Sequence, residues 1–356
     1  MHEDFVIESN RGPYRVHFDD QLLDHADRLF AGETHLLIDS RVALLYRDRF
    51  GDRIGHPCTL LLDATEENKS IERVIEFIRR LVDNKIRRNH RLVAVGGGII
   101  QDITCFIAST LLRGLEWTFV PTTLLAQADS CIGSKSSINL GSVKNILGTF
   151  NPPSEVHICQ GFLGTLDPKD IRSGIGEIIK VHAIDSAASF DRLAADYGRL
   201  QPGSTALQDY IRAALLIKRR YIEADEYDRG IRNIFNYGHS FGHAIESATS
   251  FAVPHGIAVT MGMDIANRIA ALRGLLPENH YRRMHPVLAA NYREALTVPL
   301  PARPILDALT KDKKNTTSSL VLIFPVGEKA EVSRVEVAND AGFADQLEQA
   351  LAGLRT

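Results

Sequence analysis

Short apolar runs alternate with helix-spaced segments through the first half of the chain. Buried strands of a parallel sheet are near-continuous apolar runs, and the helices between them place apolar residues three or four positions apart. A hairpin over 5–18 is expected to precede this alternation, with its turn at Arg11-Gly12-Pro13. The predicted strands are 34–38, 58–62, 91–95 and 117–120, and the predicted helices are 21–30 and 71–82. This order predicts an α/β domain with a doubly wound parallel sheet.

The pattern changes after Asn151-Pro152-Pro153, because apolar residues then recur almost only at helical spacing up to residue 273. A late apolar run at 319–325 predicts a strand, and 340–354 predicts a closing helix. A chain of 356 residues favours two domains, which we place at 1–160 (α/β) and 161–356 (mostly α-helical). The clearest predicted helices of the second domain are 171–182, 206–224, 233–247 and 257–275.

Composition and charge argue against several classes of function. The formal net charge is −3 with no dense Lys/Arg block, which does not favour binding to nucleic acid or a membrane surface. No stretch reaches the roughly 18 apolar residues of a membrane helix, and the acidic start is not followed by the apolar run of a signal peptide. The four cysteines are widely spaced, as is typical of reduced thiols. We therefore expect a soluble, cytoplasmic protein.

A glycine run follows one of the predicted strands. Gly96, Gly97 and Gly98 stand between the strand 91–95 and a helical segment. Glycines at this place let the backbone approach a pyrophosphate, whose charge the helix N-terminus favours, as in Rossmann-like domains. Asp39, which closes an earlier strand, could accept hydrogen bonds from a ribose hydroxyl. A tight turn and a helix cap are the plainer alternatives for these residues.

Histidines and a glutamate in the second half suggest a metal site. His239 and His243 are four residues apart, so a helix would place both imidazoles on one face. His255 begins a further predicted helix, and Glu177 lies on the helix 171–182. One carboxylate and two imidazoles from separate elements would suit an open catalytic zinc site. The alternative is that the His-x-x-x-His spacing arises by chance and one histidine merely packs in the core.

Cationic residues accompany these candidates. Lys135 and Lys144 lie in a segment rich in Gly, Ser and Asn that we predict to be a loop. Such a loop, with donors and positive charge, suits a phosphorylated anionic substrate, although a single Lys is more often a solvated surface charge.

The order of these motifs resembles the dehydroquinate synthase family from about residue 35 to residue 330. The motifs are Gly96 to Asp102, Arg113-Gly114, Val120 to Ser130, Lys135, Asn139, Lys144-Asn145, Gly176 to Lys180, Gly230 to Arg232, Asn236 to Glu246, His255-Gly256 and Asp312 to Lys314. The resemblance implies Glu177, His239 and His255 as ligands of Zn²⁺ or Co²⁺. It implies NAD contacts at Asp39, Glu66, Lys69, Gly97, Gly98, Asp102, Thr122 and Thr123. It implies substrate contacts at Asp129, Lys135, Lys144, Asn145, Lys180, Lys218, Arg232, Asn236, His243 and Lys313 or Lys314, with Arg113 reaching the phosphate across a homodimer interface.

The implied reaction is that of a phosphorus-oxygen lyase, 3-dehydroquinate synthase, on a phosphorylated sugar acid of the shikimate pathway. A ring hydroxyl is oxidised by NAD, phosphate is eliminated, the ketone is reduced again, and the ring opens and recloses by an aldol step. Arg232 and Lys218 resemble a clamp for the substrate carboxylate, and Asn236 also matches 3-dehydroquinate synthase. Several positions beside the site depart from the family pattern: Asp63-Ala64-Thr65, Gln101, Cys105, Ser134, Val143, Val181-His182 and Ile257.

These departures leave three alternatives. The first is another sugar phosphate cyclase that acts on an amino-heptulosonate, sedoheptulose or glucose phosphate, for which Arg232 would have no carboxylate to bind when the substrate is neutral. The second is a metal-dependent alcohol or polyol dehydrogenase, which would accumulate NADH. The third is a catalytically inactive binding protein, against which the intact Glu177, His239 and His255 argue.

Overall fold

The chain divides into two compact units. The computed structural model describes residues 3–141, 143–311, 315–316 and 318–355. The first unit consists of Met1–Leu166 and Lys218–Asp228, and the second of Asp167–Ile217 and Arg229–Thr356. The sequence did not reveal that Lys218–Asp228 groups with the first unit, and the boundary between 160 and 161 stays a prediction.

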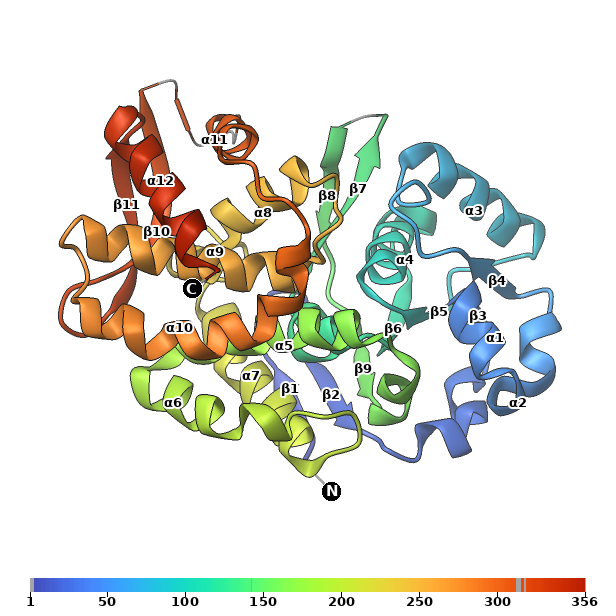
Figure 1. Cartoon of the computed structure of the whole chain (residues 1–356). Helices are drawn as coiled ribbons and strands as arrows, with labels where there is room; N and C mark the ends of the chain where they lie inside the picture. Colours follow the sequence, from blue (N-terminus) through green and yellow to red (C-terminus); the bar gives the residue numbers. More distant parts are fainter. Residues whose placement is uncertain (1–2, 142, 312–314, 317, 356) are drawn as a thin grey trace. The chain divides into compact units, whose positions relative to one another are not determined.

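A seven-stranded sheet forms the centre of the first unit (Figure 1). Its strand order is β1-β2-β9-β6-β5-β3-β4, and every neighbouring pair is parallel except the β1–β2 hairpin. The middle strands are mainly apolar and buried except at their ends, as a sheet covered on both faces requires. The predicted doubly wound parallel sheet is thereby confirmed. The strands are β1 (Phe5–Ile7), β2 (Tyr14–Phe18), β3 (Thr34–Asp39), β4 (Thr59–Leu62), β5 (Arg91–Gly96), β6 (Glu116–Pro121) and β9 (Glu155–Ile158).

The order of these strands creates a switch point beside β3. From β3 the chain passes to β4 on one side and then crosses to β5 on the other side of β3. Ligands of doubly wound sheets bind at the carboxyl ends of strands where the strand order reverses in this way. The ends of β3 and β5 are therefore the expected nucleotide site. The connecting helices are α1 (Ser40–Leu45), α2 (Arg47–Phe50), α3 (Ile71–Asp83) and α4 (Gly98–Thr110).

Two predictions for the first unit are wrong. The predicted helix 21–30 is a pair of short 3-10 helices, Leu22–Asp24 and Ala26–Phe30, separated by His25 with non-helical φ −132° and ψ 41°. The predicted loop around Lys135 and Lys144 is an antiparallel hairpin of β7 (Lys135–Leu140) and β8 (Val143–Phe150). Most residues of β8 are exposed on both faces, so the sequence there lacks the alternation that marks a half-buried strand.

The second unit is mostly helical and packs around α9. This helix is buried over almost its whole circumference, and it contacts α5, α8 and α10. Such burial explains its continuous apolar sequence from Ile257. The helices are α5 (Pro168–Asp185), α6 (Ala187–Asp196), α7 (Thr205–Ala224, whose end from Lys218 belongs to the first unit), α8 (His239–Ala248), α9 (His255–Leu272), α10 (Glu278–Tyr292), α11 (Ala302–Thr310) and α12 (Ala341–Gly353).

Two features of the second unit differ from the sequence expectation. The predicted helix 233–247 is interrupted, because a 3-10 helix (Ile231–Asn236) ends before Gly238, whose φ of 78° is left-handed, and α8 starts only at His239. The late strand is present as β10 (Ser319–Val326), and it pairs with a strand that the sequence did not reveal, β11 (Glu331–Ala338). The interruption at Gly238 and the additional strand β11 are both local differences. The mostly helical character of the unit is confirmed.

The four cysteines match the sequence expectation. All four cysteines are free, and three are buried. Burial raises the pKa of the Cys105 and Cys131 thiols to about 12, so they stay neutral and unreactive near neutral pH. Among the described residues, none of the helices combines the length and apolarity required to cross a membrane.

Candidate functional site

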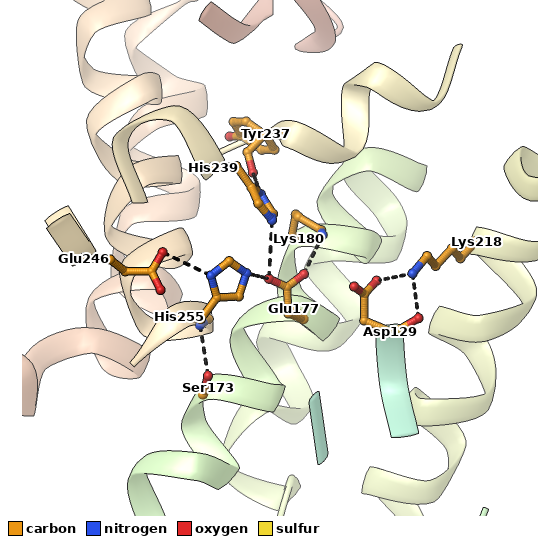
Figure 2. Close-up of polar contacts among 10 residues, drawn as sticks. Asp129, Ser173, Glu177, Lys180, Lys218, Tyr237, His239, Glu246 and His255 are labelled. Carbon is orange, nitrogen blue, oxygen red and sulfur yellow. Dashed lines mark hydrogen bonds and ion pairs between the residues drawn. The ribbon is translucent and has the colours of Figure 1, made fainter. Parts of the chain in front are cut away.

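One carboxylate and two imidazoles, from three helices of the second unit, lie together (Figure 2). Glu177 lies in the middle of α5, and His239 and His255 are the first residues of α8 and α9. Glu177 Oε1 is 3.3 Å from His255 Nε2 and 3.8 Å from His239 Nε2. The predicted metal ligands are thus brought together by the fold, although they are 62 and 16 residues apart along the chain.

Close backbone packing at glycines fixes these three residues. Glu177 and His239 each follow a glycine, Gly176 and Gly238, and His255 directly precedes one, Gly256. A Cβ atom on Gly256 would lie 1.8 Å from the carbonyl oxygen of Ser173, and one on Gly176 would lie 2.2 Å from that of Gly256. The Gly256 amide also donates to Ser173 Oγ at 2.9 Å. Only glycines permit α5 and α9 to approach so closely, and this approach places Glu177 beside His255.

Each imidazole is oriented by a partner on its other nitrogen. His255 Nδ1 is 3.2 Å from Glu246 Oε2, and His239 Nδ1 is 3.3 Å from the carbonyl oxygen of Tyr237. In both rings Nε2 is therefore the nitrogen directed at Glu177. Metal-binding histidines have this arrangement, with one nitrogen held by a carboxylate or carbonyl and the other free for the ion.

The charges of the cluster are strongly coupled. Burial alone would raise the pKa of Glu177, but the Lys180 ammonium, 2.5 Å from Oε2, and the neighbouring imidazoles hold that pKa well below its usual range. Burial, assisted by Lys180, holds the pKa of His239 well below its usual range. Burial also acts to lower the pKa of His255, but its hydrogen bonds to Glu177 and Glu246 dominate and raise it to about 10. The carboxylate is thus ionised, as a metal ligand must be.

The donor set fits a divalent ion such as zinc. The Glu177 side chain is 1% exposed, and beyond the ion pair with Lys180 and the two imidazole contacts its oxygens have no hydrogen bond, so the buried anion lacks full compensation. An ion bound to one carboxylate and two imidazoles would supply that compensation and leave a position open for substrate. His243 is close enough to offer a second ligand set, since His239, His243 and His255 have ligand atoms within 4.8 Å of one another.

The carboxyl ends of β3 and β5 contain the predicted nucleotide residues. Gly96 ends β5, Gly97 caps α4, and a Cβ atom on Gly97 would lie 3.0 Å from Thr123 Cγ2. The amide of the buried Thr122 donates to Gly96 O at 3.0 Å, which brings the threonine pair to the glycine turn. Asp39 ends the neighbouring strand β3. The glycine turn at the start of a 13-residue helix leaves the bare backbone that a pyrophosphate requires.

Asp39 and Thr123 also form local hydrogen bonds with the backbone. Asp39 Oδ1 accepts from the Arg41 amide at 2.9 Å and caps α1, while burial raises the pKa of its carboxyl. Thr123 Oγ1 accepts from the Ala126 amide at 3.2 Å. Each side chain retains further hydrogen-bonding capacity for a nucleotide.

The other predicted NAD residues form bonds with one another or with the β7–β8 hairpin. Lys69 Nζ is 2.9 Å from Asp102 Oδ2. Burial raises the pKa of Asp102 despite this lysine. Asp102 Oδ1 accepts from the Ser137 amide at 3.2 Å, and Glu66 Oε1 accepts from Asn139 Nδ2 at 2.8 Å. The NAD residues predicted from the sequence thus belong to a connected polar group. The hydrogen bonds between this group and Asn139 were not predicted.

The predicted substrate residues of the first unit are held mainly by carboxylates. Lys135 forms an ion pair with Asp228. Lys218 Nζ donates to Asp129 O at 2.6 Å and is 3.0 Å from Asp129 Oδ1 (Figure 2). Asn145 has a left-handed backbone with φ 53°, and Arg113 has φ 69°. Left-handed non-glycine residues are uncommon and concentrate at functional sites. Lys144 is exposed on β8.

The remaining predicted substrate residues lie in the second unit. Lys180 is 2% exposed and pairs with Glu177, while its ammonium lies 5.7 Å from the centre of the Phe235 ring. Arg232 is buried, and Asn236 Nδ2 donates to Asn233 O at 3.2 Å. The His243 ring centre is 5.3 Å from that of His239 and 5.6 Å from that of His255. Lys313 and Lys314 lie outside the described residues.

Glu246 and Asp228 are site residues that the sequence analysis missed. Glu246 orients His255, and Asp228 pairs with Lys135. A signal for Glu246 was present, because it lies seven residues after His239 on the helix face that carries the histidines. No local signal exists for Asp228, whose partner is 93 residues away.

Three of the unusual residues beside the site make local bonds that accommodate them. Gln101 Nε2 donates to Ser130 O at 2.6 Å, and Ser130 Oγ donates to Gln101 Oε1 at 2.7 Å. Cys105 Sγ is 3.1 Å from Asn151 O. His182 Nδ1 is 2.8 Å from Ser189 Oγ. These departures therefore remove no predicted ligand.

Two family descriptions match consecutive parts of the chain. The family description "3-dehydroquinate synthase N-terminal" matches residues 59–173, and "3-dehydroquinate synthase C-terminal" matches residues 174–315. The 3-dehydroquinate synthase of Clostridium tetani (strain Massachusetts / E88) is 33% identical over 357 residues, which cover 95% of this chain and 92% of that protein.

Two solved structures share the fold over nearly the whole chain. ValA, the 2-epi-5-epi-valiolone synthase of Streptomyces hygroscopicus subsp. jinggangensis 5008 with NAD+ and Zn²⁺ bound, matches with a TM-score of 0.79 at 28% identity over 96% of each chain. A 2-deoxy-scyllo-inosose synthase complexed with carbaglucose-6-phosphate, NAD+ and Co²⁺ matches with a TM-score of 0.79 at 23% identity. That second match covers 98% of this chain and 100% of the other.

Proposed function

The chain belongs to the 3-dehydroquinate synthase family, and we propose that this sugar phosphate cyclase converts a heptulosonate 7-phosphate to 3-dehydroquinate and phosphate. The observation that carries the proposal is the buried Glu177 carboxylate facing two oriented imidazoles. A phosphorus-oxygen lyase of this kind needs a metal, a nicotinamide cofactor and a site for an anionic substrate. Each requirement has a counterpart among the residues described above.

Glu177, His239 and His255 are proposed to hold a divalent metal, with zinc as the first choice. Lys180 keeps Glu177 ionised, and Glu246 orients His255. The glycine turn after β5, together with Asp39 and the Lys69–Asp102 pair, is proposed to hold NAD. When bound, NAD takes up and later returns a hydride, while the metal polarises the hydroxyl oxygens that it contacts. NAD is therefore unchanged over the full cycle.

The chain's own residues are proposed to bind and orient the two charged ends of the substrate. Arg232 is buried and can give a carboxylate two parallel hydrogen bonds, which sugar phosphates without a carboxylate do not require. Lys135 and Lys144 supply positive charge for the phosphate, and their cations stabilise the negative charge that grows on it as the carbon–oxygen bond breaks. Asn236 and His243 are proposed to bind ring hydroxyls. Arg113 is proposed to complete the phosphate site from the partner in a homodimer.

A second substrate class has support from one observation. The 28%-identical structural relative is a valiolone synthase. A cyclase for sedoheptulose 7-phosphate, which has a phosphate but no carboxylate, would have the same metal and nucleotide residues. Arg232 separates the two proposals, because only the heptulosonate has a carboxylate for its guanidinium.

Phosphate release from several sugar phosphates tests the proposal. The zinc-loaded protein with NAD is offered 3-deoxy-arabino-heptulosonate 7-phosphate, sedoheptulose 7-phosphate and glucose 6-phosphate in parallel. We expect release from the heptulosonate alone, abolished in Glu177→Gln. In Arg232→Met, KM for the heptulosonate should rise at least about 30-fold, as expected when a charge-assisted pair is lost. Faster release from sedoheptulose 7-phosphate or glucose 6-phosphate would refute the substrate assignment and leave the cyclase fold and cofactors in place.

A further inference from the structure

The β7–β8 hairpin is irregular at Asn139. Its ladder pairs Ile138 with Leu147 and next pairs Leu140 with Val143. The single residue Asn139 therefore faces three residues of β8, among them Lys144 and Asn145. A bulge of this kind leaves the extra residues without ladder partners. The two predicted substrate residues of β8 thus lie where the hairpin itself does not fix the backbone.

The Asn139 side chain supplies the missing partner. Its Oδ1 accepts from the Asn145 amide at 2.8 Å, while Ser137 Oγ donates to Asn145 Oδ1 at 3.0 Å. Asn145 has the left-handed φ of 53°, which few residues other than glycine adopt unless their surroundings hold them. The hydrogen bond from its amide to Asn139 is one such restraint.

The side-chain nitrogen of Asn139 binds the protein segment that is predicted to contact the nucleotide. Asn139 Nδ2 donates to Glu66 Oε1 at 2.8 Å and to Glu66 O at 3.3 Å. Its backbone amide donates to Lys69 O at 2.8 Å, so the main chain is anchored there as well. The residue is 5% exposed, and water therefore competes little with these bonds. One side chain thus connects the segment 66–69, which follows β4, to the bulge of β8.

We propose that Asn139 is a positioning residue that couples nucleotide binding at Glu66 to the backbone conformation of Asn145. The inference rests on the proposed function only in assigning NAD to the first end and substrate to the second. A carboxylate can accept several hydrogen bonds, so Glu66 can bind a nucleotide hydroxyl and Asn139 together. A nucleotide that fixes Glu66 also fixes the Asn139 amide, whose oxygen then holds Asn145. The coupling is reciprocal, so an anion at Lys144 and Asn145 strengthens NAD binding.

Hydrogen exchange of the Asn145 amide tests this coupling without any sugar phosphate. The full, zinc-loaded chain is compared with and without saturating NAD. In the wild type, NAD should slow exchange of this amide about tenfold, the factor expected when one hydrogen bond is reinforced. In Asn139→Ala, the amide should exchange faster and at the same rate with and without NAD.

A second variant separates the two ends of the bridge. Asn139→Asp retains the oxygen that accepts from Asn145 and loses the donor to Glu66. Its Asn145 amide should stay protected, with no response to NAD. Hydrogen exchange in β5 (Arg91–Gly96) would reveal whether Asn139→Ala fails to fold. In that case, Asn139→Asp alone tests the proposal.

The matched control is Ser137→Ala, which removes a contact to Asn145 and leaves both Asn139 bonds intact. It should retain the response to NAD. Equal NAD protection of Asn145 in the wild type and in Asn139→Ala would overturn the proposal, as would a wild type that shows none. Because the readout uses only NAD, failure of phosphate release would not affect it, and failure of the coupling would not affect the substrate assignment.

Discussion

The two regions that carry the proposed chemistry are held in place by different kinds of contact. In the second unit, Glu177, His239 and His255 each lie next to a glycine that packs backbone against backbone, and the helices cannot shift without clashes. In the first unit, Glu66, Asp102 and Asn145 are held by side-chain hydrogen bonds to one hairpin. Backbone packing gives a rigid set of ligands before any ion binds. Side-chain hydrogen bonds can rearrange when a nucleotide binds, so nucleotide binding can change the conformation of the hairpin.

The predicted metal ligands depend on the close packing of α5 against α9, so a substitution that disturbs this packing should destabilise the unit. Gly256→Ala places a methyl group 1.8 Å from the Ser173 carbonyl oxygen, and α5 and α9 must separate to admit it. We expect a loss of more than about 3 kcal/mol in the free energy of unfolding, measured by urea denaturation of the metal-free protein. Gly198→Ala is the control, because a methyl group there meets nothing within 4 Å. A loss below about 1 kcal/mol in Gly256→Ala would contradict rigid packing.

The zinc affinities of two variants identify the metal ligands. Glu177→Gln should weaken zinc binding by more than the roughly 100-fold that loss of an outer partner can cost, since it removes the anionic ligand. His243→Ala should change zinc affinity little. Competition with a chromogenic chelator measures both variants. If His243→Ala weakened zinc binding as much as Glu177→Gln, the three-histidine set would replace the proposed one.

The interior of α5 should also respond to pH. His182 is 3% exposed, its Nε2 has no partner, and burial lowers its pKa to about 4. In the unfolded chain the pKa is near 6.5, so between these values only the unfolded state takes up the proton. Stability therefore falls as pH drops below about 6.5, by about 2 kcal/mol at pH 5. Urea denaturation at pH 7 and pH 5 should show this loss reduced by that amount in His182→Gln, and equal losses in both proteins would rule out the contribution.

The smallest expected effect concerns the orientation of His255. Glu246→Gln weakens the contact at 3.2 Å to Nδ1 without touching Glu177. Zinc affinity should fall about tenfold, the lower end of the range for such outer partners. Glu278→Gln serves as the control, because that carboxylate is exposed and pairs with Arg268 and Arg282. Unchanged affinity in Glu246→Gln would mean that packing alone orients the ring.

The sequence predicts the parts of the fold that depend on local pattern. The strands β3 and β5 appear within one residue of their predicted ends, because buried parallel strands are continuous apolar runs. The interruption at Gly238 was missed because apolar spacing continues on both sides of it, and a left-handed residue leaves no mark on that spacing. The hairpin β7–β8 was missed because exposure on both faces removes the alternation.

For the candidate site, the sequence identifies residues and not their contacts. Glu177, His239 and His255 are recognisable from residue type, helical spacing and the family resemblance. The role of Gly256 depends on Ser173, 83 residues earlier, and the role of Asn139 depends on Glu66, 73 residues earlier. Such partners are chosen by the tertiary fold, and no local pattern contains them.

The number of phosphates released per NAD distinguishes a cyclase from a dehydrogenase. The zinc-loaded protein receives substoichiometric NAD and excess 3-deoxy-arabino-heptulosonate 7-phosphate, and phosphate and NADH absorbance are followed together. A cyclase that regenerates its cofactor should release many phosphates per NAD with no accumulation of NADH. Phosphate release that stops at one per NAD, or NADH that rises in step with product, would contradict the account and indicate a dehydrogenase.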